Sequence, residues 1–115
     1  TSNDTVDGAP PPFQLENTGN IFANVTINAT SFFSTVAFPS SFYQFKARIN
    51  ESGAFNDSVS SMNWTNMSSN GSTPHVISLD WRVIKNDFLC DINITIPDNE
   101  TPEAKSSTVT FTITG

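Results

Sequence analysis

Ten asparagines carry the one chemical pattern that recurs along this 115-residue sequence. Each stands two residues before a serine or threonine, with no proline between, which is the acceptor pattern for a glycan on the side-chain amide nitrogen. Serine and threonine together supply 29 residues, so chance would give about three such sequons from 13 asparagines. We therefore infer selection for N-glycosylation. The ten are Asn3, Asn24, Asn28, Asn50, Asn56, Asn63, Asn66, Asn70, Asn93 and Asn99.

Dense glycosylation predicts an extracellular or cell-surface location, with the sequons facing solvent. The single cysteine, Cys90, excludes a disulfide within the chain. No segment approaches the roughly 18 apolar residues of a membrane helix, and no signal peptide is recognisable. The pattern thus favours a mature secreted chain that does not insert into a membrane.

Candidates for catalysis are few, because the chain has one histidine and one cysteine. A nucleophile–histidine arrangement would need His75, which strand alternation places on an apolar face. Cys90 lies between Phe88 and Ile92 in the sequence, where a buried cysteine acts as a small hydrophobic residue. Zinc needs several cysteine or histidine ligands. We predict a protein that is not an enzyme, with no catalytic, cofactor-binding or metal-binding residues.

Calcium is the one metal for which the sequence offers any ligands. Asp98, Glu100 and Glu103 cluster in one loop, and calcium prefers such oxygen ligands. The spacing of an EF-hand is absent, however, and turn-forming residues explain the same loop. Covalent glycans are therefore the only added groups that we expect.

The charge distribution argues against polyanionic partners. The net charge is −6, and the five lysines and arginines do not cluster. A nucleic-acid-binding domain needs a basic patch, and so does a protein that binds anionic lipid. The sequence predicts neither nucleic acid nor a membrane surface as a partner.

Apolar residues recur with a period of two, which is the signature of half-buried β-strands. In residues 21–29 this alternation places Ile21, Ala23, Val25, Ile27 and Ala29 inward. Asn24 and Asn28 then face outward. Similar alternation predicts strands in residues 41–50, 75–81, 87–97 and 107–115, with a short one near 62–67.

Six or seven short strands without helical periodicity predict one antiparallel, two-sheet β-sandwich of immunoglobulin-like type. We assign residues 13–115 to this domain. Residues 1–12 end in three prolines, which predicts an extended arm or linker.

Two segments carry a family resemblance. The text "PFQLENTGNIFANVTINAT" resembles the opening of immunoglobulin-like domains in archaeal secreted and cell-surface proteins, and "ITIPDNETPEAKSSTVTFTITG" resembles their last hairpin. Together they cover about 40 residues at the two ends of the domain. The family includes surface-layer, adhesin and filament components, so the resemblance implies an architecture and a location more than an activity.

Two functional hypotheses follow. The first is a structural subunit of a glycosylated, pilus-like filament or sheath, which forms a homopolymer by donating a strand to a neighbour's sheet. The donor would be the N-terminal arm through Phe13–Leu15, which we favour, or residues 108–114. The second is an adhesion or glycan-binding module that uses the loops of residues 51–74, with Trp64 and Trp81 as candidate sugar platforms. Five sequons in residues 50–72 argue against it, because glycans would crowd that surface.

Overall fold

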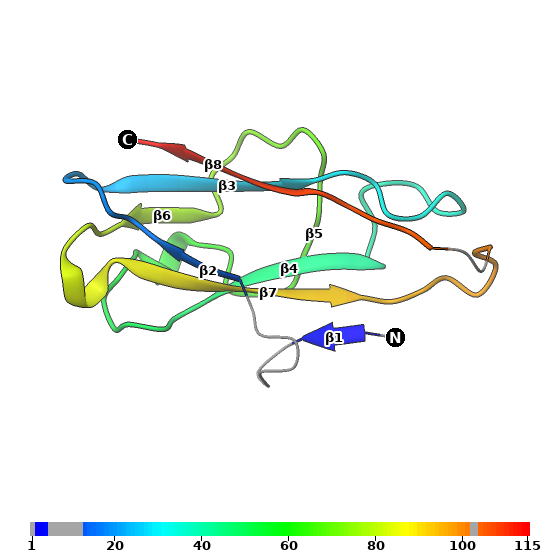
Figure 1. Ribbon diagram of the computed structural model, residues 1–115, viewed down its shortest axis with the longest axis horizontal. Coiled ribbons are helices and arrows are strands. Elements are labelled where there is room, and N and C mark those ends of the chain that lie inside the picture. The colour runs from blue at the N-terminus through cyan, green and yellow to red at the C-terminus, as the bar shows by residue number, and fades with distance from the viewer. Residues whose placement is uncertain (1, 5–12, 102–103) are drawn as a thin grey trace.

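Two antiparallel β-sheets packed face to face form the fold (Figure 1). The computed structural model describes residues 2–4, 13–101 and 104–115. Helix within these residues is confined to two short 3-10 turns, η1 (Asp57–Val59) and η2 (Val83–Lys85). The prediction of an all-β, two-sheet antiparallel sandwich is confirmed. The described part of residues 13–115 holds seven strands, within the predicted six or seven, and residues 2–4 of the predicted arm form an eighth; the shortest strand has two residues.

The five-stranded sheet is built around one central strand, β7, which pairs with β4 on one edge. Its other edge holds β1 and β2 one after the other, both antiparallel to it, with Asp4 opposite Ile92 and Phe13 opposite Cys90. The two N-terminal strands therefore share a single edge of β7. The strands of this sheet are β1 (Ser2–Asp4), β2 (Phe13–Glu16), β4 (Tyr43–Arg48), β5 (Thr65–Asn66) and β7 (Asp87–Ile94).

The three-stranded sheet has β3 at its centre. Its pairing with β8 is continuous over six residue pairs, from Asn24 opposite Thr114 to Ala29 opposite Val109. Its pairing with β6 has only two register pairs and shifts between them. One edge of β3 is thus fully paired, and the other is only partly paired. The strands are β3 (Ala23–Ala29), β6 (Val76–Leu79) and β8 (Val109–Thr114).

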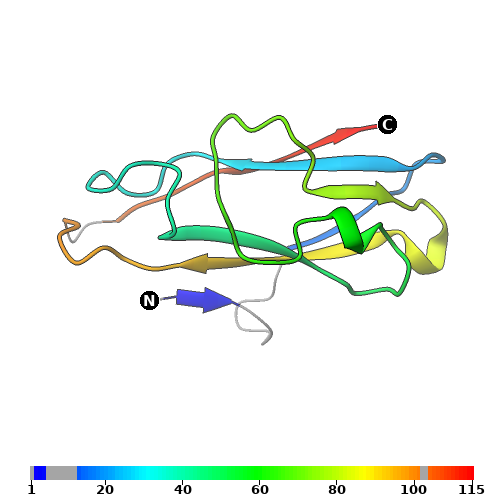
Figure 2. The same cartoon turned by 180° about the vertical axis from the view of Figure 1, so that it is seen from behind.

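The terminal strands depart from the immunoglobulin arrangement. The inner pairings, β3 with β6 and β4 with β7, match those of an immunoglobulin sandwich. In an immunoglobulin sandwich the first strand of the chain pairs with the second strand, and the last strand pairs with the sixth. Here β2 pairs with β7 and β8 pairs with β3, so the two terminal strands have exchanged sheets (Figures 1 and 2).

The core lies between the sheets, where the predicted alternation is confirmed for β3 and β4. Residues of odd number in β4 are buried, whereas Gln44, Lys46 and Arg48 are partly exposed on the outer face. Burying each large apolar side chain contributes roughly 1.5–3 kcal/mol. The largest fully buried apolar side chains are Phe45, Phe88, Ile27, Met67, Leu79, Val25 and Val76.

Three details of the predicted alternation are wrong. Ile21 precedes β3 and is 58% exposed, so the inward face begins at Ala23. On the outer face of β3, Thr26 is buried. In residues 75–81 alternation would bury the odd-numbered residues, but the buried ones are Val76, Leu79 and Asp80. The cause is Ser78, whose positive φ of 57° interrupts the two-residue period.

Candidate glycan-bearing surface

The structure places the predicted sequon asparagines at the surface. Among the nine sequon asparagines whose side chains are described, none is buried. Asn3 lies in β1, and its side chain is outside the described residues. Exposed are Asn50, Asn56, Asn63, Asn66, Asn70 and Asn99, and half-buried are Asn24, Asn28 and Asn93.

Three of these asparagines form a row across the outer face of the five-stranded sheet. Asn3 is opposite Asn93, which is opposite Gln44, which is opposite Asn66. Directly paired residues point to the same side of a sheet, and neighbouring strands lie about 4.8 Å apart. Gln44 Nε2 donates a hydrogen bond of 2.9 Å to Asn66 Oδ1. We call these four residues the outer row.

Along the partly paired edge of β3, polar side chains form hydrogen bonds with backbone groups. Ser78 N–H donates to Asn24 Oδ1 at 2.9 Å. Ile27 N–H donates to His75 Nδ1, also at 2.9 Å. Side-chain atoms here accept from backbone groups that the short β6 leaves unpaired.

Asn28 makes two such bonds to a single residue. Its Nδ2 donates to Gly71 O at 3.0 Å, and its Oδ1 accepts from Gly71 N at 2.9 Å. Next to it, Ala29 N donates to Ser68 O at 2.9 Å, so residues 68–71 lie along β3. Residues 68–71 therefore extend the sheet along β3 beyond the end of β6.

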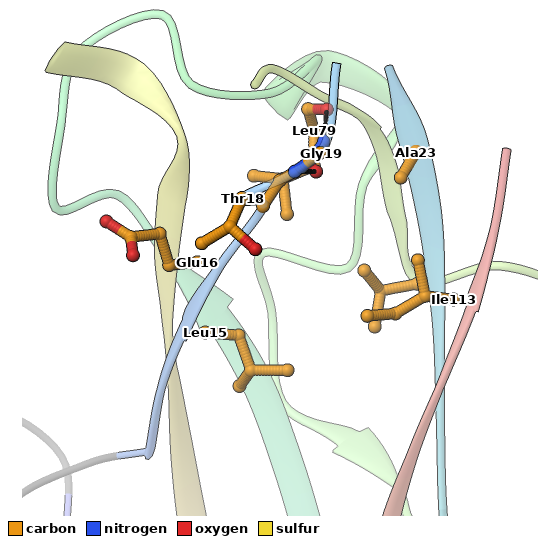
Figure 3. Close-up of a pocket in the computed structure, with 9 residues that line it drawn as sticks. Leu15, Glu16, Thr18, Gly19, Ala23, Leu79 and Ile113 are labelled. Atoms are coloured by element: carbon orange, nitrogen blue, oxygen red, sulfur yellow. Dashed lines mark hydrogen bonds between the residues drawn. The ribbon is translucent and has the colours of Figure 1, made fainter. Parts of the chain in front are cut away.

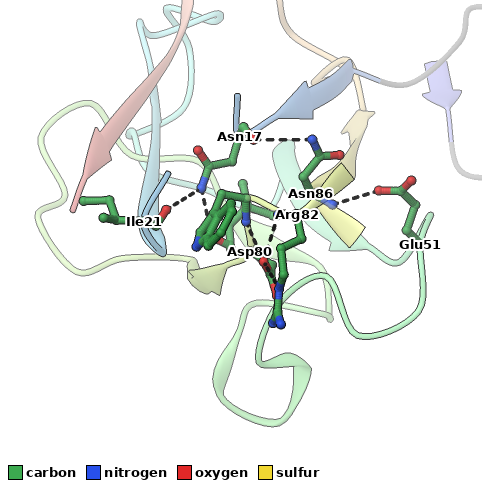
Figure 4. Close-up of polar contacts among 8 residues, drawn as sticks. Asn17, Ile21, Glu51, Asp80, Arg82 and Asn86 are labelled. Atoms are coloured by element: carbon green, nitrogen blue, oxygen red, sulfur yellow. Dashed lines mark hydrogen bonds and ion pairs between the residues drawn. The ribbon is translucent and has the colours of Figure 1, made fainter. Parts of the chain in front are cut away.

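Asn17, which is not in a sequon, closes the other end of the same edge (Figure 4). Its Nδ2 donates to Ile21 O at 2.9 Å and to Leu79 O at 3.1 Å, and its Oδ1 accepts from Gly19 N at 3.0 Å. We call Asn17, Asn24, His75 and Asn28 the β3 seam.

Asn86, also outside the sequons, joins this end of the sandwich to two further segments. Asn86 N–H donates to Glu51 Oε1 at 2.9 Å, and Asn86 Nδ2 donates to Asn17 O at 3.4 Å (Figure 4). In return, Asn17 N–H donates to Asn86 O at 2.7 Å. Beside it, hydrogen bonds from Arg82 hold the pKa of the Asp80 carboxyl well below its usual range. Sequence reasoning missed this network, because the lack of a sequon separates Asn17 and Asn86 from ten asparagines but not from the exposed Asn20.

The two residues considered for catalysis, His75 and Cys90, are both packed against other parts of the fold. The His75 ring packs edge-on against Phe45 with centroids 4.8 Å apart, and burial lowers the pKa of its imidazole. Cys90 is fully buried, and burial raises the pKa of its thiol to about 12. A thiol must ionise to act as a nucleophile or ligand. Within the described part of the chain, neither His75 nor Cys90 belongs to a group of side chains that could hold a metal ion.

Of the carboxylates considered for calcium, Glu100 is already bonded to neighbouring side chains. Glu100 Oε1 accepts from the Thr35 hydroxyl at 2.6 Å, and Lys105 Nζ lies 2.5 Å from its Oε2. Hydrogen bonds from Lys105 and Thr35 lower the pKa of Glu100 to about 2. Asp98 is exposed, and Glu103 lies outside the described residues. Glu100 therefore ties two loops at one end of the sandwich.

A cavity of about 150 Å³ opens between the edge strands β2 and β8 (Figure 3). Leu15 lines it from one sheet, and Ala23 and Ile113 line it from the other. Across the same gap, the rings of Phe13 and Phe111 meet edge to face, 5.8 Å apart. The two sheets are thus less tightly closed along this edge than in their centre.

Comparison with known proteins adds no relative. No family model matches the chain, and neither a curated protein nor a solved structure matches it. Among the described residues, no helix has the length and apolarity that crossing a membrane requires. The fold and surface together define an antiparallel β-sandwich with a dense set of sequons.

Proposed function

We propose that this chain is a non-enzymatic structural subunit of an extracellular, heavily N-glycosylated filament or sheath, and that it polymerises by donating its N-terminal strand. The observation that carries the proposal is the position of β1. Ser2–Asp4 pairs with the edge of β7 at Asp4–Ile92 and Ser2–Ile94, although residues 5–12 separate it from β2.

A segment of this kind suits exchange between subunits. Edge strands present unpaired backbone groups, so the same pairing is available to the matching segment of another copy. Three consecutive prolines, Pro10–Pro12, precede β2 and favour an extended connection over a folded one. Exchange of identical elements is a low-cost route to assembly.

The β2 strand is less suited to donation than β1. Four pairs, from Phe13–Cys90 to Glu16–Asp87, join it to its own β7. The other donor considered, residues 108–114, is joined to β3 by six pairs in β8. Either strand would have to leave a longer ladder than the three pairs that join β1 to β7, which supports a donor limited to residues 1–12.

Exposed apolar side chains support self-association independently. Four exposed apolar residues lie at one end of the sandwich: Ile21 and Phe22 just before β3, and Val83 and Ile84 in η2. Val83 is 82% exposed. Large apolar groups on a surface are typical of contacts with another molecule. An archaeal surface protein is the origin that the sequence resemblance suggests.

The adhesion hypothesis gains less support. The ammonium of Lys46 lies 4.8 Å from the centre of the Trp64 ring, so one ring face is already in contact. Trp81, the other candidate platform, is 37% exposed, although alternation in residues 75–81 places it on the same inward face as Leu79. The sequons of residues 50–72 would still surround such a site.

Deletion of residues 1–12 tests the proposal. We expect the shortened chain to stay folded but monomeric by size-exclusion chromatography, and to show no filaments by negative-stain electron microscopy. A synthetic peptide of residues 1–12 should bind the shortened chain, and a peptide with Asp4→Pro should not, because proline removes the ladder donor at the pair of Asp4 with Ile92. Polymers of the shortened chain would contradict strand donation. Globular particles from native, full-length material would contradict the filament itself.

A further inference from the structure

The bonds between Asn28 and Gly71 bear on a reactive peptide bond in the same loop. Gly71 follows Asn70, and Asn–Gly is the dipeptide in which an asparagine is most readily lost by deamidation. The glycine nitrogen attacks the side-chain carbonyl carbon of the asparagine, a five-membered succinimide forms, and ammonia leaves. Water then opens the ring to aspartate or isoaspartate. Asn70 is exposed, so solvent does not limit this reaction.

The attack needs two things from residue 71. Its nitrogen must lose its proton, and its backbone must rotate until the nitrogen reaches the Asn70 side chain. Glycine ordinarily permits that rotation, because it has no Cβ.

Both requirements conflict with the observed geometry. The Gly71 N–H donates to Asn28 Oδ1 at 2.9 Å, so its proton is held by an acceptor other than solvent. The Gly71 carbonyl is held by Asn28 Nδ2 at 3.0 Å. A Cβ at residue 71 would lie 3.3 Å from Asn28 Oδ1, which shows how closely the two residues meet. Ser68 also accepts from Asn70 N–H, at 3.4 Å.

We propose that Asn70–Gly71 is a latent deamidation site and that the side chain of Asn28 protects it. The protection is a property of the fold, because Asn28 and Gly71 are 43 residues apart. It applies to the unglycosylated chain and does not depend on the proposed function.

A consequence for Asn28 follows from amide geometry and does rest on the proposed function. In a secondary amide the substituent lies trans to the preceding carbon, and so on the side of the carbonyl oxygen. A glycan on Asn28 Nδ2 would take the position of the hydrogen that bonds Gly71 O. Asn28 therefore carries no glycan in the folded protein, although it lies in a sequon.

The test uses full-length chain from a host that adds no N-glycans, incubated in mildly alkaline buffer. Peptide mapping measures aspartate and isoaspartate at position 70. We expect Asn28→Ala to raise the rate at Asn70 at least about fivefold, the factor that one ordinary hydrogen bond can supply. Asn28→Asp keeps an acceptor for Gly71 N–H and should give a smaller rise. Asn24→Ala is the matched control on the same strand face and should leave the rate unchanged.

Equal rates in wild type and both Asn28 variants would overturn the proposal. Hydrogen exchange of wild-type Gly71 gives an answer that does not depend on variant folding, since a protected amide must exchange more slowly than an open one. Exchange at the rate of an unstructured amide would also overturn it. Glycopeptide mapping of native protein separates the two ideas. A glycan on Asn28 defeats the consequence for that residue, whereas empty sequons throughout would defeat the glycosylated-surface proposal and leave the protection of Asn70 intact.

Discussion

The β3 seam and the outer row are both lined by asparagines, yet their amides have different tasks. In the β3 seam, side chains bond backbone atoms of other segments, as when Asn17 Nδ2 donates to Leu79 O at 3.1 Å. In the outer row, the one hydrogen bond found among the described side chains joins Gln44 to Asn66. A backbone group left unpaired costs free energy, whereas an exposed amide can bond water instead. The same residue type therefore stabilises the fold in one place and stays available for a glycan in the other.

The largest effect should come from Asn17. Asn17→Ala leaves two backbone carbonyls and Gly19 N–H without their partner. We expect the free energy of unfolding to fall by about 2 kcal/mol, measured by urea denaturation. Asn20→Ala is the matched control in the same loop, because Asn20 is exposed, and should change it by less than about 0.5 kcal/mol. Equal losses of unfolding free energy in the two variants would show that bonding to backbone groups does not set Asn17 apart from an exposed asparagine.

Asn28→Ala should have an intermediate effect. It breaks two hydrogen bonds to Gly71, one fewer than Asn17→Ala breaks. We expect a loss of about 1 kcal/mol in unfolding free energy. The comparison variant is Asn63→Ala, in which an exposed sequon asparagine is removed and stability should stay within about 0.5 kcal/mol of wild type. If Asn63 proved as costly as Asn28, hydrogen bonding to the backbone would not explain the difference.

His75 makes the β3 seam sensitive to pH. Its Nδ1 must be unprotonated to accept from Ile27 N–H, and burial lowers its pKa below the usual value near 6.5. The unfolded chain then binds the proton more readily, so the contribution is complete above about pH 6.5 and is lost as the pH falls through the lowered folded pKa. We expect stability to decline between about pH 7 and pH 5, by denaturation at each pH. The slope should be smaller in His75→Gln, and an unchanged slope would assign the decline to other groups.

The outer row should give the smallest change in stability. Asn93→Gln and Asn66→Gln keep an amide on the outer face of the five-stranded sheet, and we expect unfolding free energies within about 0.5 kcal/mol of wild type. If these sites are glycosylated, each variant should lower the intact mass of native protein by one glycan. A variant that loses stability but no glycan would place that asparagine with the β3 seam.

Much of the fold could be predicted from local patterns, and much of the β3 seam could not. The alternation of β4 and the buried side of β3 follow from neighbouring residues, because a strand reverses its side-chain direction at every step. Exposure of the sequons at Asn56, Asn63 and Asn70 was also predicted correctly, because a glycan acceptor must face solvent. The sequon pattern could not separate Asn28 from these three, because its partner Gly71 is distant in sequence.

The sequence by itself determined the all-β class, the inward faces of the main strands and the set of asparagines that lie in sequons. Each of these depends on spacings of two residues, which are the same in the extended and the folded chain. Tertiary structure decided that β1 and β2 share one edge of β7, that Ser78 interrupts the β6 pattern, and that Asn17 and Asn28 bond to backbone groups. The strand pairings and the asparagine bonds join segments from 43 residues apart, for Asn28 and Gly71, to 92 residues apart, for Ser2 and Ile94, and such segments meet only when the chain folds.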